Sequence, residues 1–376
     1  MCRGMRLHFL CIIVVTLVLL LSCGGSKCVS DVVGEKIPLR YSSLLSIVEC
    51  DGYTVVDVKN PWGKGLLQRY LLVPRDSVIP QSLPQGRLLR TPLEKSIVFS
   101  GVHASLFEEL GMSNAVSGVC DAEFVYSPAV TEGLVAGAIV DCGSSLNVNR
   151  EKVMEVSPEA IFVLPYENGG YGKLENMPYT LVECADYMEN SPLGCAEWMR
   201  FYGRLLGKGI ESDSLFAAVC REYESLCRLA SGASERPTLM CELKGSSAWY
   251  VPGGESTMGR MYHDAGADYI FSSYKVSGSV PLSYEIILDK AAEADIWLVK
   301  YNSTVDLTKA SLLEDFSGYG LFRPFREGRI YACNTRRNRI FESASFHPER
   351  LLKELVALFH PELLVDYETE FYEKMH

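Results

Sequence analysis

The chain has 376 residues, of which 48% are hydrophobic and 22% are charged, and its formal net charge is −11. This length is sufficient for a folded body with two hydrophobic cores. The acidity excludes nucleic acid as an expected partner, because phosphate backbones are bound by basic patches.

Residues 1–22 have the features of a secretory signal. Arg3 and Arg6 give a basic start, and residues 9–21 are almost wholly apolar. A basic start, a short apolar run and small residues after it are typical of a signal peptide, and the run is shorter than the ~20 residues of a membrane span. The ending Leu20-Leu21-Ser22-Cys23 resembles the lipobox of bacterial lipoproteins, which implies that Cys23 is acylated and begins the mature chain. The alternatives are cleavage at another bond or an uncleaved anchor.

Loss of the signal peptide changes the charge and the cysteine content. The net charge goes from −11 to −13, and ten of the 13 cysteines remain once Cys23 carries the lipid. Spacing does not identify disulfide pairs. Cys220 and Cys227 lie two helical turns apart, roughly 10 Å, which is too far for a disulfide. We expect most of the ten to be small buried apolar side chains.

Residues 23–36 follow as a short tether, and residues 37–92 are predicted to form a β-rich extension. The expected strands are Leu44–Glu49, Tyr53–Val58 and Tyr70–Val73. Asp51-Gly52 between the first two favours a hairpin.

Residues 93–210 alternate strands with helices. The expected strands are Ser96–Ser100, Ala115–Val119, Ala138–Asp141, Ala160–Leu164 and Thr180–Glu183, and the expected helices are Ala104–Leu110, Arg150–Val156 and Pro192–Leu206. Strands separated by helices of this length imply parallel pairing with right-handed crossovers.

Residues 211–232 are predicted to be one long helix, capped by Ser212 or Asp213. Its apolar face repeats at near-3.6 spacing. The residues on this face are Leu215, Phe216, Val219, Tyr223, Leu226 and Ala230.

Residues 233–376 form a second α/β set. The expected strands are Pro237–Glu242, Trp249–Val251, Ile296–Lys300 and Ile330–Ala332, and the expected helices are Thr257–Gly266, Ser283–Ala292 and Pro348–Phe359. The sequence therefore predicts an α/β protein with two Rossmann-like lobes, joined by a single long helix and preceded by the β-rich extension.

Two groups of motifs resemble a known family. The first is Ser96–Gly111, Ala115–Val119 and Asn149–Ile161, and the second is Trp249–Thr257, Ala265–Tyr269 and Leu282–Ile296. In this order, over residues 95–359, they resemble the helical-backbone class of periplasmic binding proteins, whose members bind iron–siderophore complexes, haem or cobalamin. Each motif is weak alone, and the lipobox and the central helix make the set specific. Residues 37–92 lie outside the family pattern.

The resemblance implies a lipid-anchored protein of the periplasm that delivers a small-molecule metal complex to the permease subunits of an ABC importer. It implies a monomer with no intrinsic cofactor and no catalytic residue. An iron complex, either a siderophore or haem, is the expected ligand, and cobalamin is the alternative. A rigid cleft suits such a bulky ligand, because little ordering cost accompanies binding.

In this family an acidic residue at the tip of each lobe meets arginines of the permease. Matching the motifs places these residues at Glu151 and Glu285. Guanidinium groups bind carboxylates in an oriented, bidentate way. The alternative is that each is an ordinary first-turn glutamate, favoured by the helix dipole.

Loops at strand carboxyl ends are expected to line the cleft, because open α/β sheets bind ligands there. The candidate ligand-binding residues are Ser100, His103, Tyr166, Tyr171, Trp249, Tyr250, Arg260, Lys275, Ser277 and Tyr301. The aromatic rings could lie against a macrocycle or a catecholate, although Trp249 and Tyr250 alternate along a strand, so that only one of them faces the cleft.

Some of these candidates have a specific chemical role. His103 or Tyr166 could be an axial haem ligand, and Arg260 and Lys275 could pair with ligand carboxylates or an anionic iron chelate. The alternatives are a cap or core role for His103 and a solvated surface role for the two cations.

Other classes of protein fit less well. A receptor for free zinc or manganese would need clustered histidines and carboxylates, and the mature histidines are dispersed. An extracytoplasmic enzyme would need a catalytic motif, and neither a Gly-x-Ser-x-Gly elbow nor a His-Glu-x-x-His motif occurs. A structural surface lipoprotein would not explain two matched lobes with paired tip glutamates.

Overall fold

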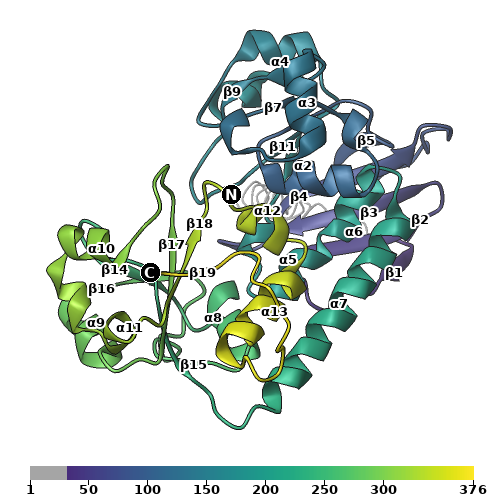
Figure 1. The fold of residues 1–376 in the computed structure, drawn as a ribbon. Coiled ribbons are helices and arrows are strands. Elements are labelled where there is room, and N and C mark those ends of the chain that lie inside the picture. Colours follow the sequence, from purple (N-terminus) through teal and green to yellow (C-terminus); the bar gives the residue numbers. More distant parts are fainter. Residues whose placement is uncertain (1–31) are drawn as a thin grey trace, which may run out of the picture.

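The computed structural model describes residues 32–376, so the signal peptide, Cys23 and most of the tether lie outside the described residues. The chain forms two α/β lobes, a long helix and a β-sheet extension (Figure 1). In Figure 1 the N-terminal lobe lies at the top, the C-terminal lobe at the lower left and the long helix α7 at the right. Within residues 32–376, no helix combines the length and the apolar character that crossing a bilayer requires.

The extension is a five-stranded sheet in the order β1-β2-β3-β4-β5. Its strands are β1 (Glu35–Ile37), β2 (Leu45–Cys50), β3 (Tyr53–Lys59), β4 (Leu66–Pro74) and β5 (Arg87–Thr91). Gly52 has a φ of 78°, which allows the tight β2–β3 hairpin that Asp51-Gly52 predicts. The Tyr70 side chain joins β4 to the N-terminal lobe, because its hydroxyl donates to the Leu181 carbonyl at 3.0 Å and accepts from the Glu183 amide at 2.7 Å.

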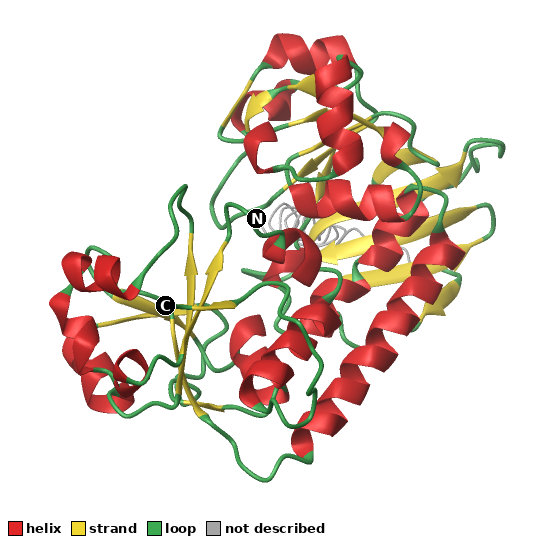
Figure 2. Cartoon of the chain, viewed as in Figure 1, coloured by secondary structure: helices red, strands yellow, loops and turns green. Residues whose placement is uncertain are grey.

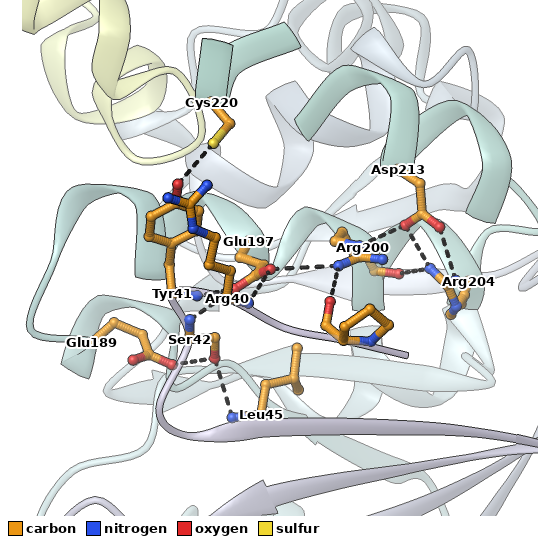
Figure 3. Close-up of polar contacts among 11 residues, drawn as sticks. Arg40, Tyr41, Ser42, Leu45, Glu189, Glu197, Arg200, Arg204, Asp213 and Cys220 are labelled. Carbon is orange, nitrogen blue, oxygen red and sulfur yellow. Dashed lines mark hydrogen bonds and ion pairs between the residues drawn. The ribbon is translucent and has the colours of Figure 1, made fainter. Parts of the chain in front are cut away.

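The segment before β2 is fixed by two buried carboxylates (Figure 3). Glu197 accepts hydrogen bonds from the amides of residues 40, 41 and 42, and Glu189 accepts from those of residues 43 and 44. The Tyr41 hydroxyl donates to Glu224 of α7 at 2.6 Å. The extension is therefore bonded both to the N-terminal lobe and to the long helix.

The N-terminal lobe has a parallel sheet in the order β12-β11-β6-β7-β8. Its strands are β6 (Ser96–Val98), β7 (Val116–Val119), β8 (Val140–Asp141), β11 (Ala160–Val163) and β12 (Thr180–Glu183). The helices between these strands are α2 (Gly101–Glu109), α3 (Pro128–Ala136) and α4 (Arg150–Val156). All four residues of β11 are buried, as expected of a strand covered on both faces.

The long helix α7 (Gly209–Ser231) has the buried face that the 3.6-residue spacing predicts. Phe216, Val219, Tyr223, Leu226 and Ala230 are buried on it, and Leu215 is half-buried. The helix begins about one turn before the predicted cap, with Lys208 at the cap position.

The C-terminal lobe has a five-stranded sheet in the order β15-β13-β17-β18-β19. Its strands are β13 (Thr238–Cys241), β15 (Asp268–Tyr269), β17 (Ile296–Tyr301), β18 (Ile330–Asn334) and the antiparallel β19 (Glu373–Lys374). A separate antiparallel pair consists of β14 (Trp249–Pro252) and β16 (Ser279–Leu282). Helices flank the strands of both lobes (Figure 2). Those of this lobe are α8 (Thr257–Asp264), α9 (Tyr284–Ala291), α10 (Lys309–Asp315) and α11 (Arg323–Arg326).

The chain then returns to the N-terminal half. Helix α12 (Ile340–Ala344) packs against α2, and α13 (Pro348–Phe359) packs along α7 (Figure 1). The two lobes are therefore held together by α7 and by this C-terminal segment.

The predicted fold class is confirmed, and several details differ. The single helix predicted over residues 192–206 is two helices, α5 (Pro192–Glu197) and α6 (Met199–Leu205). The strand predicted at residues 249–251 lies outside the main sheet of its lobe. Several elements were not predicted from the sequence, namely the strands β1, β5, β15, β16 and β19, the helix α3 and the short helices α10, α11 and α12.

Candidate functional site

A cavity of about 310 Å³ lies between the two lobes. The N-terminal lobe contributes the residues that follow its strands, namely Ser100 after β6, Asp121 after β7 and Leu164 after β11. The C-terminal lobe contributes Asn302 after β17 and Thr335 after β18. The carboxyl ends of two parallel sheets thus meet at one place, which is where open α/β folds bind ligands.

The cavity has an aromatic wall and one arginine. Phe99, Phe124, Tyr126 and Phe341 supply the rings, and Arg339 is the cation among the lining residues. Arg336 and Arg337 precede it in the same loop and are also exposed. Flat apolar surface beside guanidinium groups suits a bulky ligand that carries anionic groups.

A second cavity of about 430 Å³ shares Phe99 and Leu164 with the first. Tyr166 and Tyr171 line it. The Tyr166 side chain is 54% exposed, and its hydroxyl donates to the Gly170 carbonyl at 3.2 Å. Together the two cavities form a groove along the carboxyl edge of the N-terminal sheet.

Glu342 of α12 crosses from the C-terminal segment to the N-terminal lobe. Its carboxylate accepts from the Tyr126 amide at 2.9 Å and from the Ser105 hydroxyl at 3.4 Å. It also lies against Gly101 at the start of α2, where an added Cβ would overlap its oxygen. Burial raises the pKa of Glu342 above its usual range.

Four of the predicted ligand residues lie in the groove or next to it. Ser100 lines the first cavity, and Tyr166 and Tyr171 line the second. Burial, together with Glu183, raises the pKa of the Tyr171 phenol, which donates a hydrogen bond to that carboxylate. Tyr301 is half-buried directly before Asn302, and its hydroxyl donates to Asp306 at 3.3 Å.

His103 and Trp249 lie in the protein interior instead. The His103 side chain is 2% exposed and contacts Asp186. The Trp249 indole is fully buried, and its N–H donates to the Cys241 carbonyl at 3.0 Å. Neither side chain reaches the groove in this conformation, so we leave both out of the candidate ligand site.

The remaining four predicted ligand residues are exposed but line neither cavity. Trp249 and Tyr250 alternate along β14, with Trp249 buried and Tyr250 51% exposed, but neither lines a cavity, although one of them was expected to face the cleft. Arg260 on α8 is exposed, and so are Lys275 and Ser277 in the loop before β16. The structure therefore does not bring these four together with Ser100, Tyr166 and Tyr171.

The two predicted docking glutamates occupy equivalent positions. Glu151 and Glu285 are exposed first-turn residues of α4 and α9, which begin after the side-chain caps Asn149 and Ser283. The Glu285 backbone amide and the Ser283 hydroxyl hold the pKa of Glu285 below its usual range. Helices α4 and α9 lie in different lobes, each far from α7 (Figure 1).

The arginine loop and Glu342 were not predicted from the sequence. Both follow β18, whose position was predicted, so the rule that ligands bind beyond strand carboxyl ends would have indicated residues 335–339. The three arginines within residues 336–339 were a further indication of a site for an anionic ligand.

All nine cysteines among residues 32–376 are free, and six of them are buried. This agrees with the expectation that most are small core side chains.

Comparisons with known proteins identify a family and a relative of this chain. The family model described as periplasmic binding protein matches residues 104–336. An uncharacterized lipoprotein of Methanocaldococcus jannaschii is 27% identical over 324 residues, which cover 82% of this chain and 76% of that protein.

Two solved structures have the same fold. A possible iron-binding periplasmic solute-binding protein of Staphylococcus epidermidis has a TM-score of 0.57 at 15% identity, with coverage of 72% of this chain and 100% of that one. A periplasmic heme-binding protein of Pseudomonas aeruginosa also has a TM-score of 0.57 at 15% identity, with coverage of 75% and 98%.

Proposed function

Because the chain belongs to the periplasmic binding protein family, we propose that it is the substrate-binding protein of an ABC importer. It captures a small-molecule metal complex between its lobes and delivers it to the permease. It has no catalytic role in this proposal. Acylation of Cys23 anchors it to the membrane on the periplasmic side, and the relative of Methanocaldococcus jannaschii that is named a lipoprotein supports the anchor.

The ligand class follows from the groove between the lobes. The observation that carries the proposal is the placement of Arg339 beside Phe99, Phe124, Tyr126 and Phe341 in one inter-lobe cavity. An iron complex, either a siderophore or haem, combines flat apolar or aromatic area with anionic groups. The iron-binding and heme-binding names of the two similar structures support this class.

Within this groove we assign ligand contact to Ser100, Tyr166, Tyr171 and Arg339. Tyr166 is the candidate axial ligand if the complex is haem, since its phenol is exposed and His103 is buried. Cobalamin is the alternative ligand, because a corrin would occupy the same apolar space without a protein ligand to its metal.

The test is equilibrium dialysis of the mature protein against haemin, ferric catecholate and hydroxamate siderophores, and cyanocobalamin. Arg339→Ala should weaken binding of an anionic complex by roughly 10- to 100-fold, because charge-assisted hydrogen bonds contribute about 1.5–3 kcal/mol. Tyr166→Phe should alter the Soret band if haem is bound through the phenolate, and should leave cobalamin binding unchanged.

Tyr250→Ala is the matched control, because this tyrosine is also half-exposed but lies outside both cavities. It should bind the ligand with wild-type affinity. If the protein bound none of these complexes, the ligand class would be wrong. If Tyr250→Ala weakened binding and Arg339→Ala did not, the site would be misplaced.

A further inference from the structure

Three potential metal ligands lie together inside the N-terminal lobe, apart from the ligand groove. His103, Cys184 and Asp186 each place one ligand atom within 4.8 Å of the other two. Their exposed fractions are 2%, 0% and 4%. The cluster plays no part in the proposed capture of a metal complex.

The sheet topology brings these residues together. His103 lies in the first turn of α2, which begins directly after β6, and Cys184 directly follows β12. Strands β6 and β12 flank β11 in the parallel sheet, so their carboxyl ends lie at the same edge. Asp186 begins the 3₁₀ turn that follows β12.

Few hydrogen bonds satisfy the polar atoms of the cluster. The His103 Nε2 lies 3.2 Å from the Asp186 Oδ1, and the Tyr202 hydroxyl donates to the same oxygen at 2.6 Å. The Cys184 thiol donates to the Val182 carbonyl at 3.4 Å, and its sulfur also lies beside the His103 imidazole and the Tyr202 phenol. The His103 Nδ1 is buried and has no partner among residues 32–376. A buried polar atom without a partner is costly, and native structures contain few of them.

Aromatic side chains surround the cluster. The rings of Phe162, Tyr202 and Phe346 lie 6.2, 5.0 and 6.0 Å from the His103 imidazole. Phe346 comes from the segment between α12 and α13, so the cluster lies where the C-terminal segment packs on the N-terminal lobe. Such a dry, apolar shell strengthens the attraction between a cation and its ligands.

We propose that His103, Cys184 and Asp186 bind a divalent transition-metal ion of the zinc type, with the Tyr202 phenol as a fourth side chain in reach. Imidazole nitrogen, thiolate and carboxylate are the ligands that zinc uses in proteins. Binding requires the thiolate and a neutral imidazole, so it releases the thiol proton of Cys184 and the proton that His103 shares with Asp186 to solvent. The ion would tie α2 to the carboxyl end of β12 beside α6, and it would be a structural ion distinct from the transported complex.

Cysteine, histidine and aspartate also occur together in thiol enzymes, but the structure does not favour this chemistry here. The three side chains are too buried for a substrate carbonyl to approach the sulfur.

The test uses the mature protein, freed of metal by dialysis against a chelator and then titrated with Co²⁺ and Zn²⁺. We expect one equivalent of Co²⁺ to give the near-ultraviolet charge-transfer band of a thiolate–cobalt bond, and Zn²⁺ to displace it and raise the Tm. Cys184→Ser should abolish this band and weaken Zn²⁺ binding by at least ~10-fold, since even the loss of a residue that only supports a metal ligand costs that much.

Cys333→Ser is the matched control, because Cys333 is equally buried but lies in the C-terminal lobe. It should keep the cobalt band, as should Arg339→Ala in the groove. Asp186→Asn, which preserves the side-chain shape, gives a second ligand variant should Cys184→Ser fail to fold. The proposal is wrong if the wild-type protein shows no thiolate–cobalt band, or if Cys184→Ser retains it. Absence of the band from the wild-type protein would mean that His103 and Asp186 form only an ion pair.

Discussion

Glu197 is 1% exposed, and yet its carboxylate accepts hydrogen bonds from three consecutive backbone amides, those of residues 40 to 42. Arg200 pairs with the same carboxylate at 3.4 Å. Together these partners compensate for the burial of the charge, which would otherwise be very costly. The polar contacts that fix the extension to the body are thus concentrated at single residues (Figure 3).

Replacing Glu197 by alanine should destabilise the protein severely. The change leaves three part-buried amides without their acceptor, and an unsatisfied group costs about 1–3 kcal/mol, with the low end for a group that water can reach. We expect the free energy of unfolding to fall by at least ~3 kcal/mol, a large part of the 5–15 kcal/mol typical of a domain. Urea denaturation would show a lower midpoint, and limited proteolysis would cleave first near residues 38–45.

Glu222→Ala is the control for this prediction, because Glu222 lies on α7 with a side chain that is 52% exposed. Its weak pair with Lys353 at 4.0 Å should contribute at most ~0.5 kcal/mol. A Glu197→Ala protein as stable as Glu222→Ala would show that the carboxylate does not hold the extension in place.

At the scale of helices and strands, the long elements could be predicted and the short ones could not. The apolar face of α7 repeats over 23 residues, so its period is unambiguous. Helices α10, α11 and α12 have seven, four and five residues, too few for a clear period. The break between α5 and α6 falls at Trp198, which is fully buried, so tertiary packing rather than a local breaker fixes it.

Site residues could be predicted where a strand end alone fixes their position, and not where the rotation of a helix decides it. The positions of Ser100 and Tyr166 follow from strand ends alone, because the topology places those ends in the cleft. The orientation of His103 depends on rotation by about 100° per residue around α2. That rotation directs its imidazole toward Phe162 in the core. No sequence pattern showed this, since the residues that cover the histidine come from distant parts of the chain.

The contact between α2 and α13 should depend on pH through His347. Its Nε2 lies 2.8 Å from Glu109 of α2, and its Nδ1 lies 2.9 Å from Glu349 of α13. Burial alone would lower the pKa of His347, but the hydrogen bonds to the two carboxylates outweigh it and raise the pKa to about 9. The protonated imidazole is therefore bound more strongly in the folded than in the unfolded protein.

The direction in which stability changes with pH follows from the raised pKa of His347. The unfolded value is about 6.5, so the stabilisation is complete below pH ~6.5 and is lost as the pH rises to about 9. It amounts to at most ~3 kcal/mol, at 1.36 kcal/mol per pKa unit, and to less where solvent screens Glu109. Over this range the Tm of the wild-type protein should fall more than that of His347→Gln.

His263→Gln is the control for this measurement, since the His263 side chain is 77% exposed. It should retain the wild-type change of Tm with pH. Parallel Tm profiles for the wild-type protein and His347→Gln would mean that the histidine does not carry a proton between the helices.

At the scale of the whole molecule, two connections restrict the relative motion of the lobes. The first is α7, and the second is the C-terminal segment, in which α12 packs on α2 and α13 packs along α7. A hinge motion would have to break the bonds of Glu342 and His347 to the N-terminal lobe. We therefore expect a largely preformed groove, in which a rigid ligand binds at a small ordering cost.

A rigid pair of lobes also suits docking at two distant points. Glu151 and Glu285 begin the exposed helices α4 and α9 of the two lobes, and neither is within 4.0 Å of a cationic group among residues 32–376. In the proposed docking each carboxylate meets an arginine of the permease, and reversal of both charges should turn attraction into repulsion. Glu151→Arg combined with Glu285→Arg should abolish ligand uptake by cells and leave the ligand Kd of the purified protein unchanged.

The outcome separates docking from an ordinary role at a helix start. A first-turn glutamate that only interacts with the helix dipole contributes about 0.3–1 kcal/mol to stability, so its loss would shift the Tm slightly and leave uptake intact. Glu132→Arg combined with Glu314→Arg is a matched control, because these exposed glutamates lie on α3 and α10, one in each lobe, and carry the same change of charge. Uptake that persists in the double variant, or that is lost equally in the control, would show that the permease contacts another surface. A loss confined to the Glu151 and Glu285 variant, and seen also in each single variant, would place both lobe tips at the permease, which requires the fixed lobe spacing that α7 and α13 provide.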